Sequence, residues 1–142
     1  MGASRRISRC EVTELVNEDP LIVDADSLSF AVSQGPGYSV VSVAGDIDAG
    51  TERQFRDALT SVLARGTVRI VVDLSAVGFM ASAGIGVLMG VRRVLASAGG
   101  LLVLAAPGGE VAQVLSMTGV GDVIPVTASV ADAVALTRSA RG

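Results

Sequence analysis

The segment VVDLSAVGFMASAGIGVL, residues 71–88, decides the fold class of this chain. It continues an apolar run, Val68–Leu74, with the composition of a strand that is buried on both faces of a parallel sheet. A loop is expected after Leu74, and then a helix from about Ala83 to Ala98, which Gly99 and Gly100 end. A buried strand that leads into a helix is the repeating unit of α/β proteins, so the segment predicts helices packed on a mostly parallel sheet.

Strands and helices also alternate on the C-terminal side of this segment. The expected elements are a buried strand at Leu101–Ala106, a helix at Glu110–Met117, a short strand at Val123–Val126 and a last helix through Thr137. Gly119 is positioned to end the first of these helices, and Ser129 is positioned to cap the second.

On the N-terminal side, two strands are expected before the first helix. Apolar residues alternate with small or polar residues over Leu28–Val32, and Tyr38–Ala44 is rich in β-branched valine. Residues 34–37 form the turn between them, and Gly45–Asp48 is expected to break the second strand.

The first helix is expected over Arg53–Arg65, with Thr51 as its cap and Gly66 at its end. The complete pattern indicates a single α/β domain, with a mostly parallel sheet of about four or five strands flanked by about four helices. The chain has 142 residues, which is the size of one domain. Only 3% of the residues are aromatic, so the core must be built from Val, Ile, Leu and Ala.

Residues 1–27 differ in composition from the domain expected at 28–142. Three arginines come first, and a run of acidic residues follows without a compensating base. We expect an acidic extension, loosely ordered or docked on the domain, with a short helix over Glu11–Asn17. The alternative is a dedicated partner-binding arm.

The composition narrows the classes of function. The absence of histidine excludes histidine-dependent catalysis, and a single cysteine, Cys10, allows neither an intramolecular disulfide nor a thiolate cluster; we expect a free thiol there. The arginines are scattered along a chain of net charge −3, which does not indicate nucleic-acid binding. No apolar run is long enough for membrane insertion and no secretory signal is recognisable, so a cytoplasmic protein is expected.

Two patterns in residues 82–90 suggest sites that the sequence does not support. Gly84, Gly86 and Gly90 form GxGxxxG, which is one residue off the dinucleotide fingerprint and lies too far beyond the strand. Glycines that let the helix approach the sheet closely are the simpler interpretation. Ser82 lacks the first glycine of a nucleophile elbow and any histidine or lysine base, so hydrolase chemistry is not expected.

Three carboxylates, Asp46, Asp48 and Asp73, lie at the ends of predicted strands, where α/β domains place ligand sites. They could hold a divalent cation, but such residues more often cap turns and helices. We therefore expect no metal, no cofactor and no enzymatic activity.

Ser82 has a different physical property, because it lies at the expected start of a helix. It is expected to act as an ordinary N-cap. Helix N-termini present unpaired N–H groups and the positive end of the helix dipole, so a phosphate on Ser82 would be accommodated without refolding. Phosphorylation would add about −1.5 to −2 charges at the surface and would change what can dock there.

Three short motifs in order carry a family resemblance. Residues 71–88 closely resemble the signature of STAS domains, specifically those of bacterial anti-sigma-factor antagonists. Gly45–Thr51 is similar to a family loop of the form Gly-Glu-Leu-Asp-x-x-Thr, and Val111–Ile124 is similar to the family's later helix and final strand. The resemblance covers about residues 28–136 and leaves the first 27 residues outside.

The resemblance implies a binding switch. Proteins of this kind bind an anti-sigma factor that is an ATP-dependent serine kinase, and this binding frees a sigma factor. Phosphorylation of the antagonist ends the binding, and a metal-dependent serine phosphatase restores it. The phosphoacceptor corresponds to Ser82. The partner-binding residues correspond to Asp48, Thr51, Met80, Ala81, Ser82, Ala83, Gly84 and Gly86.

This chain departs from the family pattern on both sides of Ser82. The family has an acid before the phosphoserine and a hydroxyl residue after it, where this chain has Ala81 and Ala83. A lost hydroxyl removes a hydrogen bond worth about 1 kcal/mol. The departures leave three outcomes open: weak phosphorylation, an atypical kinase, or an antagonist that binds constitutively.

Two other functions share the expected fold. One is an accessory STAS subunit of a membrane transporter, and the other is a domain that senses a nucleotide or another small ligand. The sequence leaves the oligomeric state open, and a homodimer is compatible with it.

Overall fold

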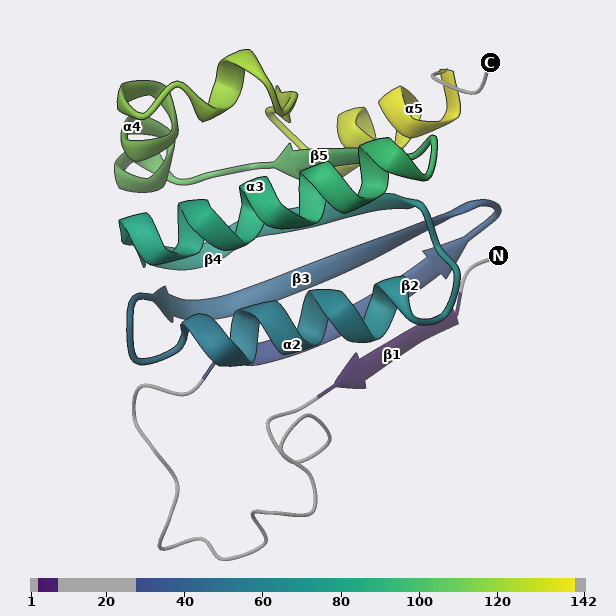
Figure 1. Ribbon diagram of the computed structural model, residues 1–142, viewed down its shortest axis with the longest axis horizontal. Helices are drawn as coiled ribbons and strands as arrows, with labels where there is room; N and C mark the ends of the chain where they lie inside the picture. The colour runs from purple at the N-terminus through teal and green to yellow at the C-terminus, as the bar shows by residue number, and fades with distance from the viewer. Residues whose placement is uncertain (1–2, 8–27, 140–142) are drawn as a thin grey trace, which may run out of the picture.

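The computed structural model describes residues 3–7 and 28–139, which form one α/β layer around a twisted sheet (Figure 1). The sheet runs in the order β1-β2-β3-β4-β5-β6. Its strands are β1 (Ala3–Ile7), β2 (Ser29–Gly35), β3 (Tyr38–Ile47), β4 (Arg69–Met80), β5 (Leu101–Ala105) and β6 (Val126–Thr127). The helices are α2 (Glu52–Leu63), α3 (Ser82–Ser97), α4 (Gly109–Met117) and α5 (Val130–Ser139), with a 3-10 turn, η3, at Val120–Asp122.

The pairing of the strands confirms the predicted fold class. β1, β2 and β3 pair antiparallel, whereas β3, β4, β5 and β6 pair parallel in sequence order. The parallel strands are joined through helices, as parallel connections require. Their carboxyl ends therefore meet at one edge of the sheet, where α2, α3, α4 and α5 begin.

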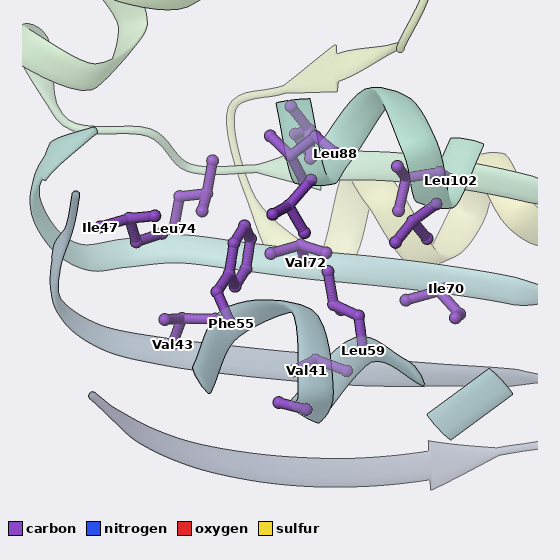
Figure 2. Packing of buried hydrophobic residues seen from close by; sticks show 14 of the residues in the cluster. Val41, Val43, Ile47, Phe55, Leu59, Ile70, Val72, Leu74, Leu88 and Leu102 are labelled. Atoms are coloured by element: carbon purple, nitrogen blue, oxygen red, sulfur yellow. The ribbon is translucent and has the colours of Figure 1, made fainter. Parts of the chain in front are cut away.

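The core lies on both faces of the sheet because the central strands are apolar on both sides. On one face, Phe55 and Leu59 of α2 and Leu88 of α3 point toward valines of β3 and β4 (Figure 2). On the other face, Val71 of β4 packs in a smaller cluster with Ala133 of α5. This double burial explains the continuous apolar run in β4 and confirms the interpretation of residues 68–74 as a two-sided strand.

β3 and β4 are longer than the sequence predicted, and this corrects two expectations. Gly45–Asp48 was expected to break β3, but the strand continues to Ile47. A loop was expected after Leu74, but β4 continues to Met80. Register shifts between Ser42/Ala44 and between Gly45/Asp46 absorb the irregular sequence, and Gly45 has a φ of 120°, which favours glycine.

β1 adds a strand that the sequence did not predict. It pairs with β2 from Ala3 opposite Gln34 to Ile7 opposite Phe30, so the sheet has six strands rather than four or five. The segment ASRRI has no alternating apolar pattern, and backbone pairing at an edge needs none. Cys10 and the helix predicted over Glu11–Asn17 lie outside the described residues.

At the C-terminal end, the predicted strand at Val123–Val126 is wrong in position. Residues 120–122 form η3, and the strand is limited to Val126–Thr127. Ser129 caps α5 as predicted, because its Oγ accepts a hydrogen bond from the Asp132 amide at 3.0 Å. None of the helices in the described part of the chain is long and apolar enough to span a membrane.

Candidate functional site

The ends of β3 and β4 bring two separate parts of the sequence together. Ile47 lies beside Met80 in the sheet, and the Ala81 amide donates to the Ile47 carbonyl at 2.8 Å. The loop after β3 and the first turn of α3 are therefore neighbours at the carboxyl edge of the sheet. This is the edge where open α/β sheets bind their ligands.

The loop between β3 and α2 is held by hydrogen bonds around Asp48 and Thr51. The Asp48 carboxylate accepts from the amides of Gly50 at 2.9 Å and Thr51 at 3.1 Å. The Thr51 hydroxyl donates to the Asp46 carbonyl at 2.8 Å and accepts from the Asp48 amide at 3.0 Å. Thr51 is only 1% exposed, so it fixes the loop from inside.

This arrangement corrects the predicted cap of α2. Thr51 stands at the N-cap position, but it makes no side-chain hydrogen bond to the helix. Its hydroxyl is engaged with the preceding loop instead. The turn of this loop is stabilised by Asp48, whose carboxylate accepts hydrogen bonds from two backbone amides, as in an Asx turn.

Ser82 is the first residue of α3 rather than its cap, which corrects a second expectation. The N-cap is Ala81, in an extended conformation with φ −89° and ψ 172°, and it has no side chain that can cap the helix. Ser82 is exposed, and its hydroxyl takes part in none of the hydrogen bonds between described residues. The first amides of a helix lack intrahelical acceptors, and this makes the helix N-terminus the positive end of its dipole. The exposed hydroxyl of Ser82 therefore stands at the positive end of α3.

Gly84 lets α3 begin close to the sheet. A Cβ atom at this position would lie 2.6 Å from Cγ2 of Ile47 and 2.9 Å from Cγ of Met80. Met80 itself is 1% exposed. Both Met80 and Gly84 were predicted to contact a partner, but they are buried where α3 packs against the ends of β3 and β4.

The exposed aromatic Phe79 was missing from the predicted site. It lies beside Asp46 across the β3–β4 pairing and is 45% exposed, unlike Phe30 and Phe55, which are buried. A large exposed aromatic is the residue type that protein interfaces favour. The sequence carried no signal for this exposure, because a regular strand would place Phe79 on the same face as the buried Val77 and the segment was predicted to be a loop.

A groove between α2 and α3 was also missed. Its lining comprises Glu52, Arg56, Thr60, Leu63, Gly86, Val87, Gly90, Val91 and Val94. A Cβ atom at Gly86 or Gly90 would meet nothing within 4 Å, so the prediction that all three glycines bring α3 close to the sheet holds for Gly84 alone. The spacing of four residues between Gly86 and Gly90 places them on one helix face and was the available signal.

The three candidate cation ligands do not form one site. Asp73 lies in the middle of β4, where its carboxylate accepts from the Ser42 hydroxyl at 3.2 Å and the Ser75 amide at 3.0 Å. The Asp48 carboxylate is hydrogen-bonded within its own loop. Asp46 of β3 lies opposite Phe79, which follows Asp73 by six residues in β4. In the described residues, no group of three or more acidic, cysteine or histidine side chains is placed to hold a metal ion.

Comparison with known proteins now identifies the family. A model of the STAS domain matches residues 28–133. The chain belongs to the STAS-domain family. This STAS domain is 36% identical, over 63 residues, to the anti-sigma-F factor antagonist RsfB of Mycobacterium tuberculosis. That alignment covers 44% of the present chain and 52% of RsfB, so it spans about half the length of this curated relative.

Solved structures agree with this assignment. An anti-sigma factor antagonist from Mycobacterium paratuberculosis superposes with a TM-score of 0.74 and 31% identity, over 82% of this chain and 99% of that one. Unphosphorylated SpoIIAA, also an anti-sigma factor antagonist, superposes with a TM-score of 0.67 over 78% of this chain and 96% of that one. Its identity of 22% shows a shared fold alone.

Proposed function

We propose that this STAS domain is an anti-sigma-factor antagonist, which binds an anti-sigma factor and thereby frees a sigma factor. The observation that carries the proposal is the match to the M. paratuberculosis antagonist, since it extends over 99% of that chain at 31% identity. RsfB supports the same function over a shorter alignment. These relatives favour an antagonist over a transporter subunit or a ligand sensor.

The proposed docking surface is the carboxyl edge of β3 and β4. We define the switch face as Asp48, Phe79, Ala81, Ser82, Ala83 and Gly86, which are exposed or half-buried there. Thr51, Met80 and Gly84 support this face from below through the contacts described above. Gly86 also lines the α2–α3 groove, which gives a partner an apolar continuation of the same surface.

Ser82 is the proposed phosphoacceptor, and the anti-sigma factor is the proposed kinase. The transfer forms a bond between Ser82 Oγ and the γ-phosphorus of ATP, breaks the bond from that phosphorus to ADP, and releases the hydroxyl proton. The histidine-free chain supplies an exposed hydroxyl and the N-terminus of α3, and the catalytic groups belong to the partner. A metal-dependent serine phosphatase is proposed to hydrolyse the phosphoserine.

The test begins with capture from native lysate, using the wild type, Ser82→Ala and Ser82→Glu as baits. Recovery of an ATP-binding anti-sigma factor by the first two baits, but not the third, is the expected result. The recovered protein is then incubated with ATP and wild type or Ser82→Ala, and intact masses are measured. Addition of one phosphoryl group to the wild type alone supports the switch. Capture by all three baits without phosphate on Ser82 indicates a constitutive antagonist, and recovery of transporter subunits instead contradicts the proposal.

Phe79→Ala is expected to weaken binding to the captured anti-sigma factor by about tenfold, because truncation of an exposed aromatic anchor in an interface commonly costs more than 1 kcal/mol. The free energy of unfolding should change little, since the side chain is largely outside the core. Met117→Ala is the matched control, as Met117 is an exposed apolar residue on α4 with 76% exposure. Equal affinities for the two variants in a calorimetric titration would remove Phe79 from the docking surface.

A further inference from the structure

A second pocket lies at the opposite edge of the sheet from the switch face. It is lined by Pro36 and Gly37 of the β2–β3 turn, Arg69 at the start of β4, and Thr137 and Arg138 at the end of α5. Its volume is about 260 Å³. Because Arg69 begins β4 and Ser82 follows its far end, the two sites are separated by roughly 35–40 Å, the length of that strand.

The lining of this pocket is positively charged. Among the residues that the structure describes, its lining contains two guanidinium groups and no carboxylate. The acidic residues near the helix starts, such as Glu52 and Asp132, lie toward the opposite edge of the sheet. Within residues 28–139, the ion pair of the structure joins Arg56 to Glu52 and involves neither Arg69 nor Arg138.

Arg69 contains a buried donor without an acceptor. Its Nε is inaccessible to solvent and has no hydrogen-bond partner among the described residues. Buried N–H groups of charged side chains are nearly always paired, because an unpaired one loses hydration without compensation. The charge of Arg138 is explained by its place in the last turn of α5, where cations stabilise the helix dipole. That explanation does not extend to Arg69, which is a half-buried strand residue.

We propose that this pocket binds the phosphate group of a small molecule. A phosphate dianion matches the two positive charges, and the terminal Nη groups of arginine donate paired hydrogen bonds to phosphate oxygens, which leaves the buried Nε of Arg69 out of the contact. The volume is below the range of about 300–1,000 Å³ that is usual for sites of drug-sized ligands, which favours a compact anion. Gly37 leaves the entrance open, since a Cβ atom there would meet nothing within 4 Å. The C-terminal end of α5 weakly disfavours an anion, and two arginines outweigh it.

The test follows backbone amide signals of the full chain by NMR during titration with inorganic phosphate and, separately, with glycerol phosphate. Sodium chloride at matched ionic strength is the reference. Saturable shifts at Gly37 and Thr137 are expected with both phosphates. Tighter binding of the ester assigns the site to a phosphorylated small molecule, and equal affinity assigns it to free phosphate.

The variants Arg69→Gln and Arg138→Gln are each expected to weaken phosphate binding at least tenfold. Arg65→Gln is the control, because Arg65 is exposed after α2 and does not line the pocket. Arg138 is exposed, so its variant tests the site even if Arg69→Gln fails to fold. Equal shifts with chloride and phosphate, or an unchanged affinity in Arg138→Gln, would overturn the proposal.

Discussion

Ser82→Asp is expected to weaken binding to the anti-sigma factor at least about 100-fold without lowering the free energy of unfolding. A carboxylate buried in an interface without a partner costs several kcal/mol, and each 1.4 kcal/mol corresponds to about a factor of ten in affinity. The switch face contains one acidic residue, Asp48, and no arginine or lysine, so it offers the added carboxylate no cation when a partner covers it. In the free protein, the same carboxylate stands at the N-terminus of α3, where the helix dipole favours it.

The matched control for this change is Ser129→Asp. Ser129 also stands at a helix start on the carboxyl edge of the sheet, two strands away from β4, and aspartate caps helices as well as serine does. The two variants therefore carry the same charge change in similar local settings. Calorimetric titration with the anti-sigma factor and urea unfolding of both variants separate binding from stability. Retained affinity in Ser82→Asp, or an equal loss in Ser129→Asp, would contradict the assignment of the switch to Ser82.

Ala81 and Ala83, on either side of Ser82, bear on how far the proposed phosphorylation depends on the partner. Ala81 leaves the start of α3 without a side-chain cap, and Ala83 offers no second hydroxyl. Within residues 3–7 and 28–139, no hydrogen bond fixes the rotamer of the Ser82 side chain. If Ser82 is phosphorylated as proposed, the kinase is expected to orient the hydroxyl itself. The rate of the proposed phosphorylation is therefore expected to be the property most sensitive to Ala81 and Ala83, whereas binding is expected to depend on the shape of the switch face.

The fold was predictable because its strongest signals are local. The apolar run of β4, the spacing of Phe55, Ala58, Leu59 and Val62 in α2, and the glycines after the helices each depend on only a few neighbouring residues. The extensions of β3 and β4 were not predictable in this way, because a polar or glycine-containing segment stays in a sheet only when its partner strand pairs with it. β1 was not predicted for the same reason, since it is held in the sheet by backbone pairing with β2.

The candidate site was predictable in position but less so in detail. A serine at a helix start beside a strand-end loop was visible in the sequence. The sequence did not show which of the site residues are exposed and which are buried, because their burial depends on how closely α3 packs against β3 and β4. Met80 and Thr51 are buried, and the exposed Phe79 and the α2–α3 groove take their place in the proposed contact surface.

Gly84→Ala is expected to destabilise the domain by about 1–3 kcal/mol, which is the usual cost of an extra methyl group in a closely packed contact. The new Cβ would lie within 3 Å of Ile47 and Met80, and both neighbours are buried. Ile47 is β-branched and stiff, so relief requires movement of α3 away from the sheet. The same movement displaces Ser82 from the β3–α2 loop, and binding of the anti-sigma factor should weaken together with stability.

Gly86→Ala and Gly90→Ala are the controls, because they make the same change in the same helix at positions with open space. Each is expected to stabilise the domain by about 0.5–1 kcal/mol, since alanine favours an α-helix over glycine by that amount. Urea unfolding of the three variants measures the contrast directly. Opposite signs for Gly84 and Gly90 would establish that Gly84 is kept small by contact with the sheet. Stabilisation in all three would mean that α3 can adjust freely, and the height of Ser82 above the sheet would then not depend on that contact.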